Sequence, residues 1–439
     1  MLTTEIEVMK DKNLELLIDE FRSTIRGDVL LSTDPGYEDA RHIWNGMFDR
    51  KPLLIARCIC TRDVINSVNF ARDNNLLISV KGGGHNIAGN AICDDGLMID
   101  LSLMRRVNVD KVNETVQVDG GALLGDLDSE TQLYNLAVSG GGMISHTGVG
   151  GLTLGGGFGW ISRKHGLAVD NLISAEIVTA DGKLLTASKE ENADLFWAIR
   201  GGGGNFGIVT SFKFRCVRLD RVYSGLIVKK FENAKEYIKF HREYVRKLPD
   251  DMTTWLIIRH APPLPFLSKK VHGKLVVVIA FVWLGNEEKG AEIIEPLRNK
   301  TESYGESIGI NEWTDWQSSF DGLVTHGARN YWKSHYLKEL PDECIDTILR
   351  FAKSMPTDEC DILIPHMEGM PSKIEEDETA YAHRKEPFIL NIHARWHDKL
   401  ADKKCIKWAK ELHDATKEFA EGVYVNFLSN EGEERVRDA

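Results

Sequence analysis

The sequence predicts an α+β protein of two domains, and three observations carry this prediction. The chain has 439 residues, which is more than one core usually serves, because hydrophobic cores stop growing at about 250 to 300 residues. Clusters of glycine separate short β-like runs throughout the first half. After Cys216 the pattern changes to long charged helices that alternate with strong strands. We therefore expect a domain boundary near residue 217.

In the first half, short apolar runs predict strands and longer amphipathic runs predict helices. Strands are expected at LLISV (76–80), LMIDL (97–101), ETVQV (114–118), LISAEIV (172–178) and IVTSFKF (208–214). Helices are expected at DVINSVNFARDNN (63–75) and NADLFWAIR (192–200). Asp181-Gly182 separates two apolar runs and predicts a hairpin turn, because Asp-Gly tolerates the positive φ that such turns need.

In the second half, helices are expected at NAKEYIKFHREYVRKL (233–248), CIDTILRFAKSM (344–355) and KKCIKWAKELHDATKEFA (403–420). Strands are expected at MTTWLII (252–258), KLVVVIAFVWL (274–284) and FILNIHARW (388–396). Alternation along the last strand gives an apolar face of Phe388, Leu390, Ile392, Ala394 and Trp396. The other face carries Ile389, Asn391, His393 and Arg395. A polar strand face of this kind is usually exposed to solvent, and the alternative is that it lines a pocket.

Composition narrows the partners and the compartment. A net charge of -12 argues against nucleic acid or an anionic membrane as the main partner. No apolar run reaches the roughly 18 residues that span a bilayer. The seven scattered cysteines predict reduced thiols in a cytoplasm, rather than a disulfide framework or a zinc site. The N-terminal MLTTEIEVMKDKNLELLIDE has acids within its apolar run, so we do not expect a secretory signal.

The segment VKGGGHNIAG (80–89) is hard to explain as ordinary structure. Three consecutive glycines lose much backbone freedom on folding, and they directly precede His85, a residue type suited to chemistry near neutral pH. Further glycines cluster at 140–142, 148–159 and 201–207. Glycine lets main-chain N–H groups approach a phosphate. Composition alone leaves two readings open, a cradle for a phosphate-bearing cofactor or the tight turns of a β-rich domain.

Residues Gly202 to Gly207 match G-x-G-x-x-G, the pattern of dinucleotide-binding loops. In a Rossmann fold this motif follows a strand and opens a helix. Here it follows the helical NADLFWAIR and precedes the strand IVTSFKF. We therefore reject a Rossmann fold for this chain.

Several segments, taken together and in order, point to a known family. They are VKGGGHNIAG (80–89), LMIDLSLMRRVNVD (97–110), SHTGVGGLTLGGGFGW (145–160), RKHGLAVDNL (163–172), DLFWAIRGGGGNFGIVTSFKF (194–214), RNYWKSHYL (329–337), TAYAHR (379–384) and YVNFL (424–428). The chain resembles, over nearly its whole length, the berberine-bridge-enzyme-like branch of the vanillyl-alcohol-oxidase superfamily, whose members carry a PCMH-type FAD-binding domain.

The resemblance implies the domain organisation. Residues 1–216, with a core at about 48–216, would bind FAD, and residues 417–439 would return to this domain. Residues 217–416 would form an antiparallel sheet covered by helices, whose opposite face overlooks the flavin. The family continues beyond the segment that matches NEGEERVRDA with a helix and an Asp-Pro-x-Asn-x-Phe tail, whereas this sequence ends at Ala439. A removed tail and a shortened variant both stay open.

The resemblance also implies the cofactor site. The loop Lys81 to Asn86 would wrap the FAD pyrophosphate, and His85 would be bonded to the 8α-methyl of the flavin. A neutral imidazole nitrogen can attack an activated methyl group; the alternative is a turn histidine hydrogen-bonded to backbone. The expected cofactor residues are Lys81, Gly82, Gly83, Gly84, His85, Asn86, Gly89, Gly142, Thr147, Gly148, Gly151, Leu154, Gly156, Gly159, Trp160, Gly207, Ile208 and Asn426.

Some family members attach the flavin a second time, through a cysteine shortly before the G-V-G-G run. The matching residue here is Ile144, which cannot form a thioether, and no cysteine lies between Cys93 and Cys216. We therefore expect a single histidyl link and no cysteinyl link. Thr147 stands where the family carries a side chain that influences oxygen access, and it does not decide whether oxygen is the acceptor.

The catalytic positions of the family are where this sequence departs from it. The family's glutamate matches Ile389 and its tyrosine matches Phe427, and neither can take a proton. His393, Tyr424, His335 and Lys333 could supply a base instead, and we expect His393, Tyr424 and Asn391 at the catalytic centre. A missing base favours amines over alcohols as substrates, because a neutral amine needs no strong base. His383-Arg384 and Arg329 would either bind an anionic substrate group or form ion pairs.

The expected function is that of an FAD-dependent oxidase or dehydrogenase that acts on a small amine, alcohol or sugar-like compound. Hydride transfer to the flavin would oxidise the substrate, with molecular oxygen as the expected acceptor. The alternative is a catalytically silent flavoprotein relative with a structural or coat-type role. Loss of both base positions keeps this alternative open, and the intact His85 loop argues against it.

Overall fold

The structure is a computed structural model that describes residues 16–429. The predictions about the C-terminal tail, and those about the first 15 residues, lie outside the described residues. The seven cysteines are free thiols, and six of them are buried. The reduced state of the thiols and the cytoplasmic location stay predictions.

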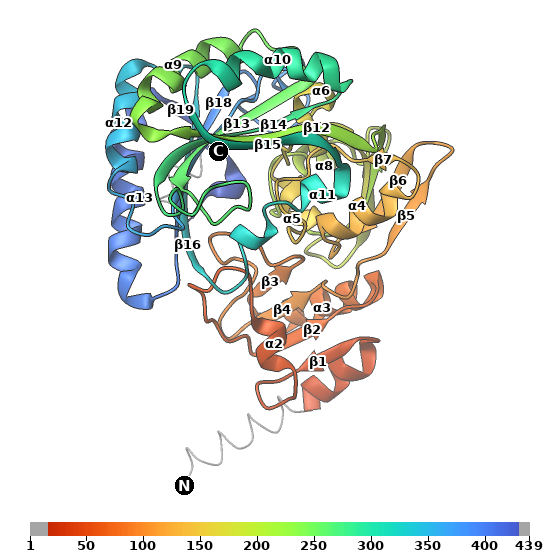
Figure 1. Cartoon of the computed structure of the whole chain (residues 1–439). Coiled ribbons are helices and arrows are strands. Elements are labelled where there is room, and N and C mark those ends of the chain that lie inside the picture. Colours follow the sequence, from red (N-terminus) through yellow and green to blue (C-terminus); the bar gives the residue numbers. More distant parts are fainter. Residues whose placement is uncertain (1–15, 430–439) are drawn as a thin grey trace.

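A four-stranded sheet occupies the N-terminal end of the described chain (Figure 1). Its strands, in spatial order, are β1 (Asp28–Leu30), β2 (Leu54–Arg57), β4 (Leu97–Asp100) and β3 (Ile78–Lys81). β2, β4 and β3 are parallel, because α3 (Thr61–Asp73) connects β2 to β3 as a crossover helix. A short helix, α2 (Tyr37–Arg41), precedes β2. The three glycines before His85 therefore begin where a strand of this sheet ends.

A five-stranded antiparallel sheet follows, with the order β5 (Val107–Asp110), β6 (Thr115–Asp119), β10 (Ile208–Arg215), β8 (Leu172–Val178) and β9 (Leu184–Ser188). The connections carry α4 (Leu124–Gln132), α5 (Val149–Leu154), α6 (Ser162–His165), α7 (Ala168–Asn171) and α8 (Ala193–Ala198), and β7 (Leu136–Ala137) pairs with β11 (Val217–Arg218). The predicted hairpin at Asp181-Gly182 is confirmed, with Gly182 at φ 76. α8 directly precedes β10, as the rejection of a Rossmann loop requires.

The second half of the chain forms one eight-stranded sheet in which all neighbours are antiparallel. Its spatial order is β15 (Ser303–Glu312), β12 (Arg221–Lys230), β14 (Leu275–Trp283), β13 (Met252–His260), β17 (Asp361–Pro365), β18 (Phe388–Trp396), β16 (Arg329–Leu337) and β19 (Ala420–Gly422). The helices of this half are α9 (Ala234–Val245), α10 (Glu287–Asn299), α11 (Trp313–Gln317), α12 (Asp342–Ala352) and α13 (Asp402–Thr416).

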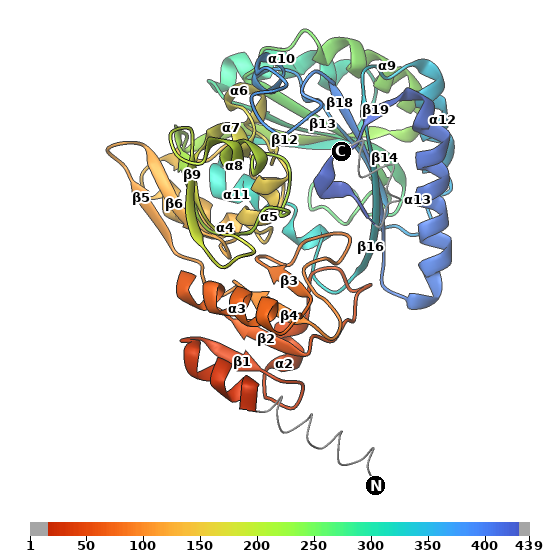
Figure 2. The same ribbon diagram turned by 180° about the vertical axis from the view of Figure 1, so that it is seen from behind.

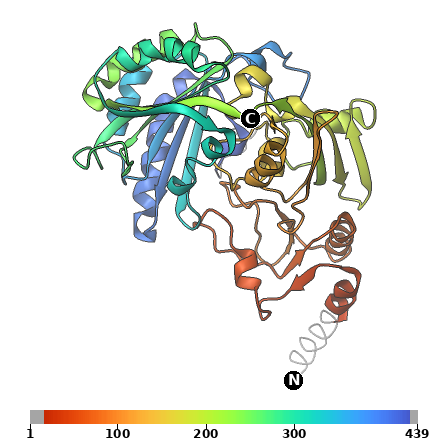
Figure 3. The ribbon, with the colours of Figure 1, turned by 45° about the vertical axis from the view of Figure 1, so that its right-hand side comes forward.

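Helices α9, α10, α12 and α13 cover the face of this sheet that points away from the first half (Figures 2 and 3). The predicted apolar face of β18 packs there, because Phe388, Leu390, Ile392, Ala394 and Trp396 share one core with side chains of these helices. The opposite face of the sheet packs against Ile144, Phe158 and Trp160 of the first half, together with other residues. The predicted α+β fold with a helix-covered antiparallel sheet is confirmed.

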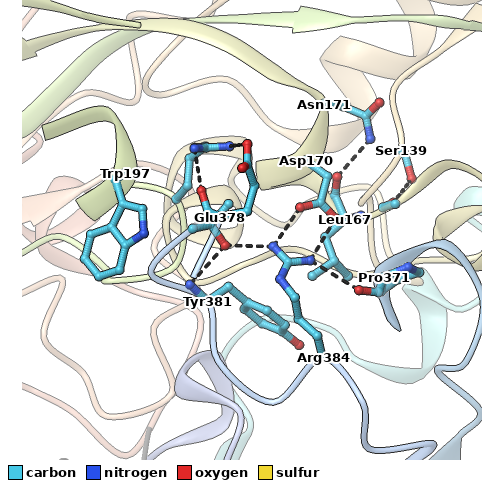
Figure 4. Close-up of polar contacts among 12 residues, drawn as sticks. Ser139, Leu167, Asp170, Asn171, Trp197, Pro371, Glu378, Tyr381 and Arg384 are labelled. Carbon is cyan, nitrogen blue, oxygen red and sulfur yellow. Dashed lines mark hydrogen bonds and ion pairs between the residues drawn. The ribbon is translucent and has the colours of Figure 1, made fainter. Parts of the chain in front are cut away.

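A segment between β17 and β18 ties the two halves together (Figure 4). Arg384 is fully buried and pairs with Asp170 at 2.8 Å, while the Trp197 indole donates to the carbonyl of Asp377 at 2.7 Å. Near the end of the described chain, β19 first pairs with β16 of the large sheet. Asn426 then donates to the carbonyl of Leu152 at 3.0 Å, so the chain does reach the first half again. The exact division into two domains stays a prediction.

Candidate functional site

A cavity of about 480 Å³ lies between the two halves of the molecule. One side consists of the loop that follows β3, the loop before α5, and the first residues of α5. The other side consists of strands β12, β13, β14, β16, β17 and β18, and the turn η6 (Val425–Phe427) closes the wall. Both groups of predicted site residues, those of the glycine loops and those of the large sheet, contribute to this one cavity.

Glycine backbone forms much of the first side, for two different reasons. Gly83 and Gly148 approach each other so closely that a Cβ on Gly83 would lie 2.4 Å from the Gly148 nitrogen. Gly142 and Gly151 also line the cavity, but a Cβ on either would meet no atom within 4 Å. These two positions therefore keep space open rather than permit tight packing. Open backbone of this kind suits a ligand whose phosphates accept main-chain N–H groups.

His85 lies in the cavity wall with its ring held on two sides. Its Nε2 is 2.7 Å from Nδ1 of His146, and its ring stacks on Trp44 with centroids 4.7 Å apart. The alternative of a turn histidine bonded to backbone is not what the structure shows, since the partner is a side chain. Burial holds the pKa of His85 well below its usual value, and nearby His146 and His326 lower it further. The imidazole is therefore neutral near pH 7.

His146 and His326 form a cluster with His85, in which one ring nitrogen of each lies within 4.8 Å of the others. His146 lies within the motif SHTGVGGLTLGGGFGW (145–160), but neither it nor His326 was among the predicted site residues. Burial lowers the pKa of both residues. The cluster is thus a set of neutral imidazoles around the predicted point of flavin attachment.

Twelve of the predicted site residues line the cavity. They are Gly82, Gly83, Gly84, His85, Asn86, Gly142, Thr147, Gly148, Gly151 and Asn426 of the cofactor set, with His393 and Tyr424 of the catalytic set. Ile144, the residue that replaces the family's cysteine, lines it as well.

The other predicted cofactor residues lie outside this cavity wall, and packing accounts for their positions. Trp160 is fully buried and stacks on Trp255 at 3.9 Å, and Ile208 belongs to a hydrophobic core. The Lys81 ammonium donates to the carbonyl of Ala40 at 2.7 Å. The carbonyl of Leu154 accepts from two backbone N–H groups. Four glycines complete the set, each closely approached by another part of the chain: Gly89, Gly156, Gly159 and Gly207. Their contact with a cofactor stays a prediction.

The predicted catalytic residues are placed differently from one another. Tyr424 accepts at its hydroxyl from the Gly157 N–H at 3.1 Å and from the Asn426 amide at 2.8 Å, and burial raises its pKa to about 12. Asn391 is fully buried and contacts His393 rather than the cavity. Of the two family positions, Ile389 is buried in the apolar core and Phe427 lines the cavity.

The remaining candidate bases and cations of the sequence analysis lie away from the cavity. Lys333 and His335 are both buried and are absent from its wall. Arg329 forms two 2.6 Å contacts with the carboxylate of Asp402. Arg384 pairs with Asp170 between the two halves, so it is neither a surface ion pair nor a wall residue. Both arginines thus form ion pairs, which was the alternative to anion binding, and the pair of Arg384 is buried rather than at the surface.

Several wall residues of the large sheet were not among the predicted site residues, and Arg259, Asp361 and Trp332 are three of them. Asp361 Oδ1 lies 2.9 Å from Nδ1 of His393, and Trp332 stacks on the His393 ring at 4.1 Å. No local motif marks Arg259 or Asp361, whereas Trp332 lies within the segment RNYWKSHYL (329–337) without a predicted role. They come together only through the pairing of strands that are distant in sequence.

None of the helices within residues 16–429 has the length and the apolar character needed to cross a bilayer. A family model described as an FAD binding domain matches residues 52–188. An FAD-linked oxidoreductase of Dictyostelium discoideum is 32% identical over 416 residues, which cover 93% of this chain and 88% of the relative.

Two solved structures share the fold over almost the whole chain. The crystal structure of 6-hydroxy-D-nicotine oxidase from Arthrobacter nicotinovorans has a TM-score of 0.83 and 26% identity, covering 94% of this chain and 91% of that one. Glucooligosaccharide oxidase from Acremonium strictum, whose structure is described as containing 6-S-cysteinyl, 8α-N1-histidyl FAD, has a TM-score of 0.80 and 25% identity. The match covers 92% of this chain and 88% of that one.

Proposed function

Because this chain belongs to the FAD-linked oxidoreductases of the berberine-bridge-enzyme-like branch, with its PCMH-type FAD-binding domain, we propose that its flavin is linked covalently through His85. We propose further that the protein oxidises a small amine, alcohol or sugar-like compound by hydride transfer to the flavin, with molecular oxygen as the acceptor. The flavin supplies the two-electron acceptor that no amino-acid side chain provides.

The position of His85 is the observation that carries the proposal. Its Nε2 is engaged by His146, which leaves Nδ1 as the ring nitrogen for a bond to the cofactor. The low pKa of His85 keeps the ring neutral, and in the tautomer in which Nε2 donates to His146 the nucleophilic lone pair is on Nδ1. Stacking on Trp44 fixes the plane of the ring. The related glucooligosaccharide oxidase, whose description names an 8α-N1-histidyl FAD, supports the same kind of bond here.

The other wall residues have separate proposed roles in cofactor binding and in catalysis. The glycine loops at 82–84 and 148–151 offer main-chain N–H groups to phosphates, and the open positions Gly142 and Gly151 leave room for the cofactor. Ile144 cannot form a thioether, so we propose no cysteinyl link. His393 and Tyr424 line the cavity and are the proposed catalytic side chains. Asn391 does not line the cavity, and its side-chain amide contacts Nε2 of His393. Burial of the wall keeps bulk water from the reacting groups.

The relatives act, by their names, on different kinds of compound, so they do not narrow the proposed substrate class of this protein. One structural relative is a 6-hydroxy-D-nicotine oxidase and the other is a glucooligosaccharide oxidase. The silent structural alternative has less support, because His85 and His393 line one cavity.

A substrate screen with the purified protein tests the proposal. The protein should be yellow, and under anaerobic conditions some amine, alcohol or sugar of the panel should bleach the flavin absorbance. Admission of air should restore the colour and release hydrogen peroxide. Slow recovery in air, with fast recovery on a dye acceptor, would make the protein a dehydrogenase instead. A colourless protein that takes up no added FAD would contradict the proposal as a whole.

A further inference from the structure

Three histidines from separate loops meet beside the cavity wall. His85 lies in the loop after β3 and His146 in the loop before α5. His326 lies between the turn η2 (Asp321–Leu323) and β16. One ring nitrogen of each histidine lies within 4.8 Å of the others. Only His85 lines the cavity, and His326 is exposed, so the cluster runs outward from the cavity wall to solvent.

The loops of His85 and His326 are both tied to Trp44. The Trp44 N–H donates to the carbonyl of Gly84 at 3.1 Å, and the Trp44 carbonyl accepts from the Gly327 N–H at 3.1 Å. The His85 ring also stacks on the Trp44 indole, with centroids 4.7 Å apart. Because Gly84 and Gly327 each adjoin a histidine of the cluster, these contacts fix the two loops relative to each other.

The loop of His146 is tied to the segment that carries His326. The carboxylate of Asp321 accepts from the Ser145 N–H at 2.8 Å and from the Ser145 hydroxyl at 2.5 Å. All three histidines therefore stand on backbone that other contacts already hold in place. A site that is ordered in advance loses less entropy when its ligand binds.

The three imidazoles offer lone pairs rather than charges. Burial lowers the pKa of each ring, so the rings are neutral near pH 7, and the neutral ring is the form that binds metal ions. Nε2 of His85 is 2.7 Å from Nδ1 of His146. Nε2 of His146 is buried and has no hydrogen-bond partner within residues 16–429. The proton of His146 can stand on this Nε2, which leaves the Nδ1 lone pair for a metal ion.

Small shifts bring the three nitrogens to the spacing of a metal site. Zn²⁺ binds imidazole nitrogen at about 2.0 to 2.1 Å, so two nitrogens of a tetrahedral site are about 3.4 Å apart. The 2.7 Å pair of His85 and His146 has to open slightly. The widest gap, at most 4.8 Å, has to close by about 1.4 Å. The exposed ring of His326 is free to make this movement, and water can take the fourth position from the same side.

The surroundings of the cluster favour metals that prefer nitrogen ligands. The three residues of the cluster offer no carboxylate, so Mg²⁺ and Ca²⁺, which prefer oxygen, are poor ligands for it. The charged groups near the rings are Arg395 and Lys81, which disfavour a cation, and Asp321, which favours one. Affinity therefore has to come from bonds to neutral nitrogen, and imidazole suits Zn²⁺, Cu²⁺ and Ni²⁺.

We propose that His85, His146 and His326 form a binding site for a divalent transition metal of the Zn²⁺ and Cu²⁺ class. The metal ion binds Nε2 of His85, whereas the flavin would be attached to Nδ1 of the same ring. Once Nδ1 carries the flavin, the neutral ring has its remaining lone pair on Nε2, so the metal and the flavin can be present together. The metal site goes beyond the proposed function and does not depend on the flavin bond.

The test measures binding of Zn²⁺, and separately of Cu²⁺, to the purified full-length protein without an affinity tag. Calorimetry gives the stoichiometry and affinity for Zn²⁺, and electron paramagnetic resonance of bound Cu²⁺ reports its nitrogen ligands. The variants are His326→Gln, whose side chain is exposed, and His146→Gln. The control is His397→Gln, an exposed histidine that pairs with Glu359. Mg²⁺ is the control ion, and unfolding midpoints show whether each variant is folded.

We expect wild-type protein to bind one Zn²⁺ per chain at the cluster and to bind no Mg²⁺ there. Each of the two variants should weaken Zn²⁺ binding by about 10²-fold or more, since even the loss of a group that only supports a ligand costs about 10- to 10²-fold. Bound Cu²⁺ should show hyperfine coupling to several nitrogens in wild type and to fewer in His326→Gln. His397→Gln should bind both metals like wild type.

Three results would overturn the inference. One is wild-type protein that binds no Zn²⁺ and no Cu²⁺. Another is equal Zn²⁺ affinity in wild type and in folded His326→Gln, and the third is a loss of affinity in His397→Gln as large as in His326→Gln. The mass of the unfolded protein reports the flavin bond separately. Failure of metal binding would therefore leave the covalent-flavin proposal standing, and absence of the flavin bond would leave the metal site standing.

Discussion

Gly151 shows how a single residue can serve a ligand rather than the fold. It lies within α5, yet a methyl group at its Cα would meet no protein atom within 4 Å. Packing and turn geometry therefore do not require glycine at this position, and glycine weakens a helix relative to alanine by about 1 kcal/mol. The space beside it belongs to the cavity.

We predict opposite effects of Gly151→Ala on stability and on cofactor content. The helix should gain up to about 1 kcal/mol, while the added methyl group should occupy cofactor space and lower the flavin bound per polypeptide. Thermal unfolding in a His85→Ala background, from which the flavin can be removed, and the flavin-to-protein absorbance ratio with His85 present measure the two effects. Gly309→Ala is the control, since Gly309 on β15 is equally uncrowded and lies outside the cavity. Full flavin content in Gly151→Ala would refute this assignment of the space.

At the residue scale, the sequence predicted those site residues that a short local motif marks. His85 follows a run of glycines, and this pattern leads to the cavity wall without knowledge of the fold. Asp361 could not be found in this way, because its position in the cavity wall depends on the strand register that places it opposite His393. Trp160 stands within a cofactor motif, and its ring is buried in a hydrophobic core, so its contact with the cofactor stays a prediction. Motif position alone does not separate a wall residue from the packing behind it.

At the element scale, amphipathic periodicity located most of the long helices and strands correctly. The prediction for residues 388–396 coincides with β18, and the helix predicted at 233–248 contains α9. β16 and β17 were not among the predicted strands, although both carry wall residues. β17 has only five residues and is buried, so it lacks a clear alternation of polar and apolar side chains. Strand order in the large sheet is likewise invisible in a single sequence.

The buried histidines of these elements predict how stability depends on pH. Burial lowers the pKa of His241 on α9 to about 3 and that of His366 after β17 to about 4. The unfolded chain takes up these protons near pH 6.5, so stability is complete above that pH and falls on acidification. Each histidine should contribute a slope of about 1.4 kcal/mol per pH unit down to its folded pKa. Asp128, with a pKa raised to about 6 by burial, opposes this below pH 6.

We predict that His241→Gln removes one of these slopes. The difference in unfolding free energy between pH 6.5 and pH 4.5 should shrink by about 2 kcal/mol, because one fewer proton is taken up on unfolding. Urea unfolding at a series of pH values measures this difference. His397→Gln serves as the control, since its ring is 62% exposed. An unchanged pH dependence in His241→Gln would show that His241 is protonated in the folded protein.

At the scale of the whole molecule, the cavity exists only while its two halves stay in place. Figure 4 shows a contact that joins them: Arg384 from the large-sheet half pairs with Asp170 from the glycine-rich half. The side-chain exposures are 0% and 5%, so neither charge is solvated. Arg384 also donates to the Thr379 hydroxyl at 2.7 Å. This pair fixes the segment between β17 and β18 against the cofactor-binding half.

We predict that Arg384→Leu lowers stability by about 3 to 5 kcal/mol, because it leaves the Asp170 carboxylate buried without its partner. The double variant Arg384→Leu/Asp170→Asn should recover much of that loss. Lys385→Ala is the matched control, since the adjacent Lys385–Glu376 pair is exposed at 63% and 54%, and such pairs contribute about 1 kcal/mol or less. Equal effects of Arg384→Leu and Lys385→Ala would argue against a role for the buried pair.

The covalent bond between His85 and the flavin is the central claim, and intact mass after denaturation tests it most directly. Wild-type protein, unfolded in acid and freed of small molecules, should weigh one FAD more than its sequence and keep its yellow colour. His85→Ala should have the mass of the polypeptide alone and release its flavin on unfolding, and His397→Gln should match wild type. Wild-type protein that releases all of its flavin, or His85→Ala protein that retains it, would contradict the account.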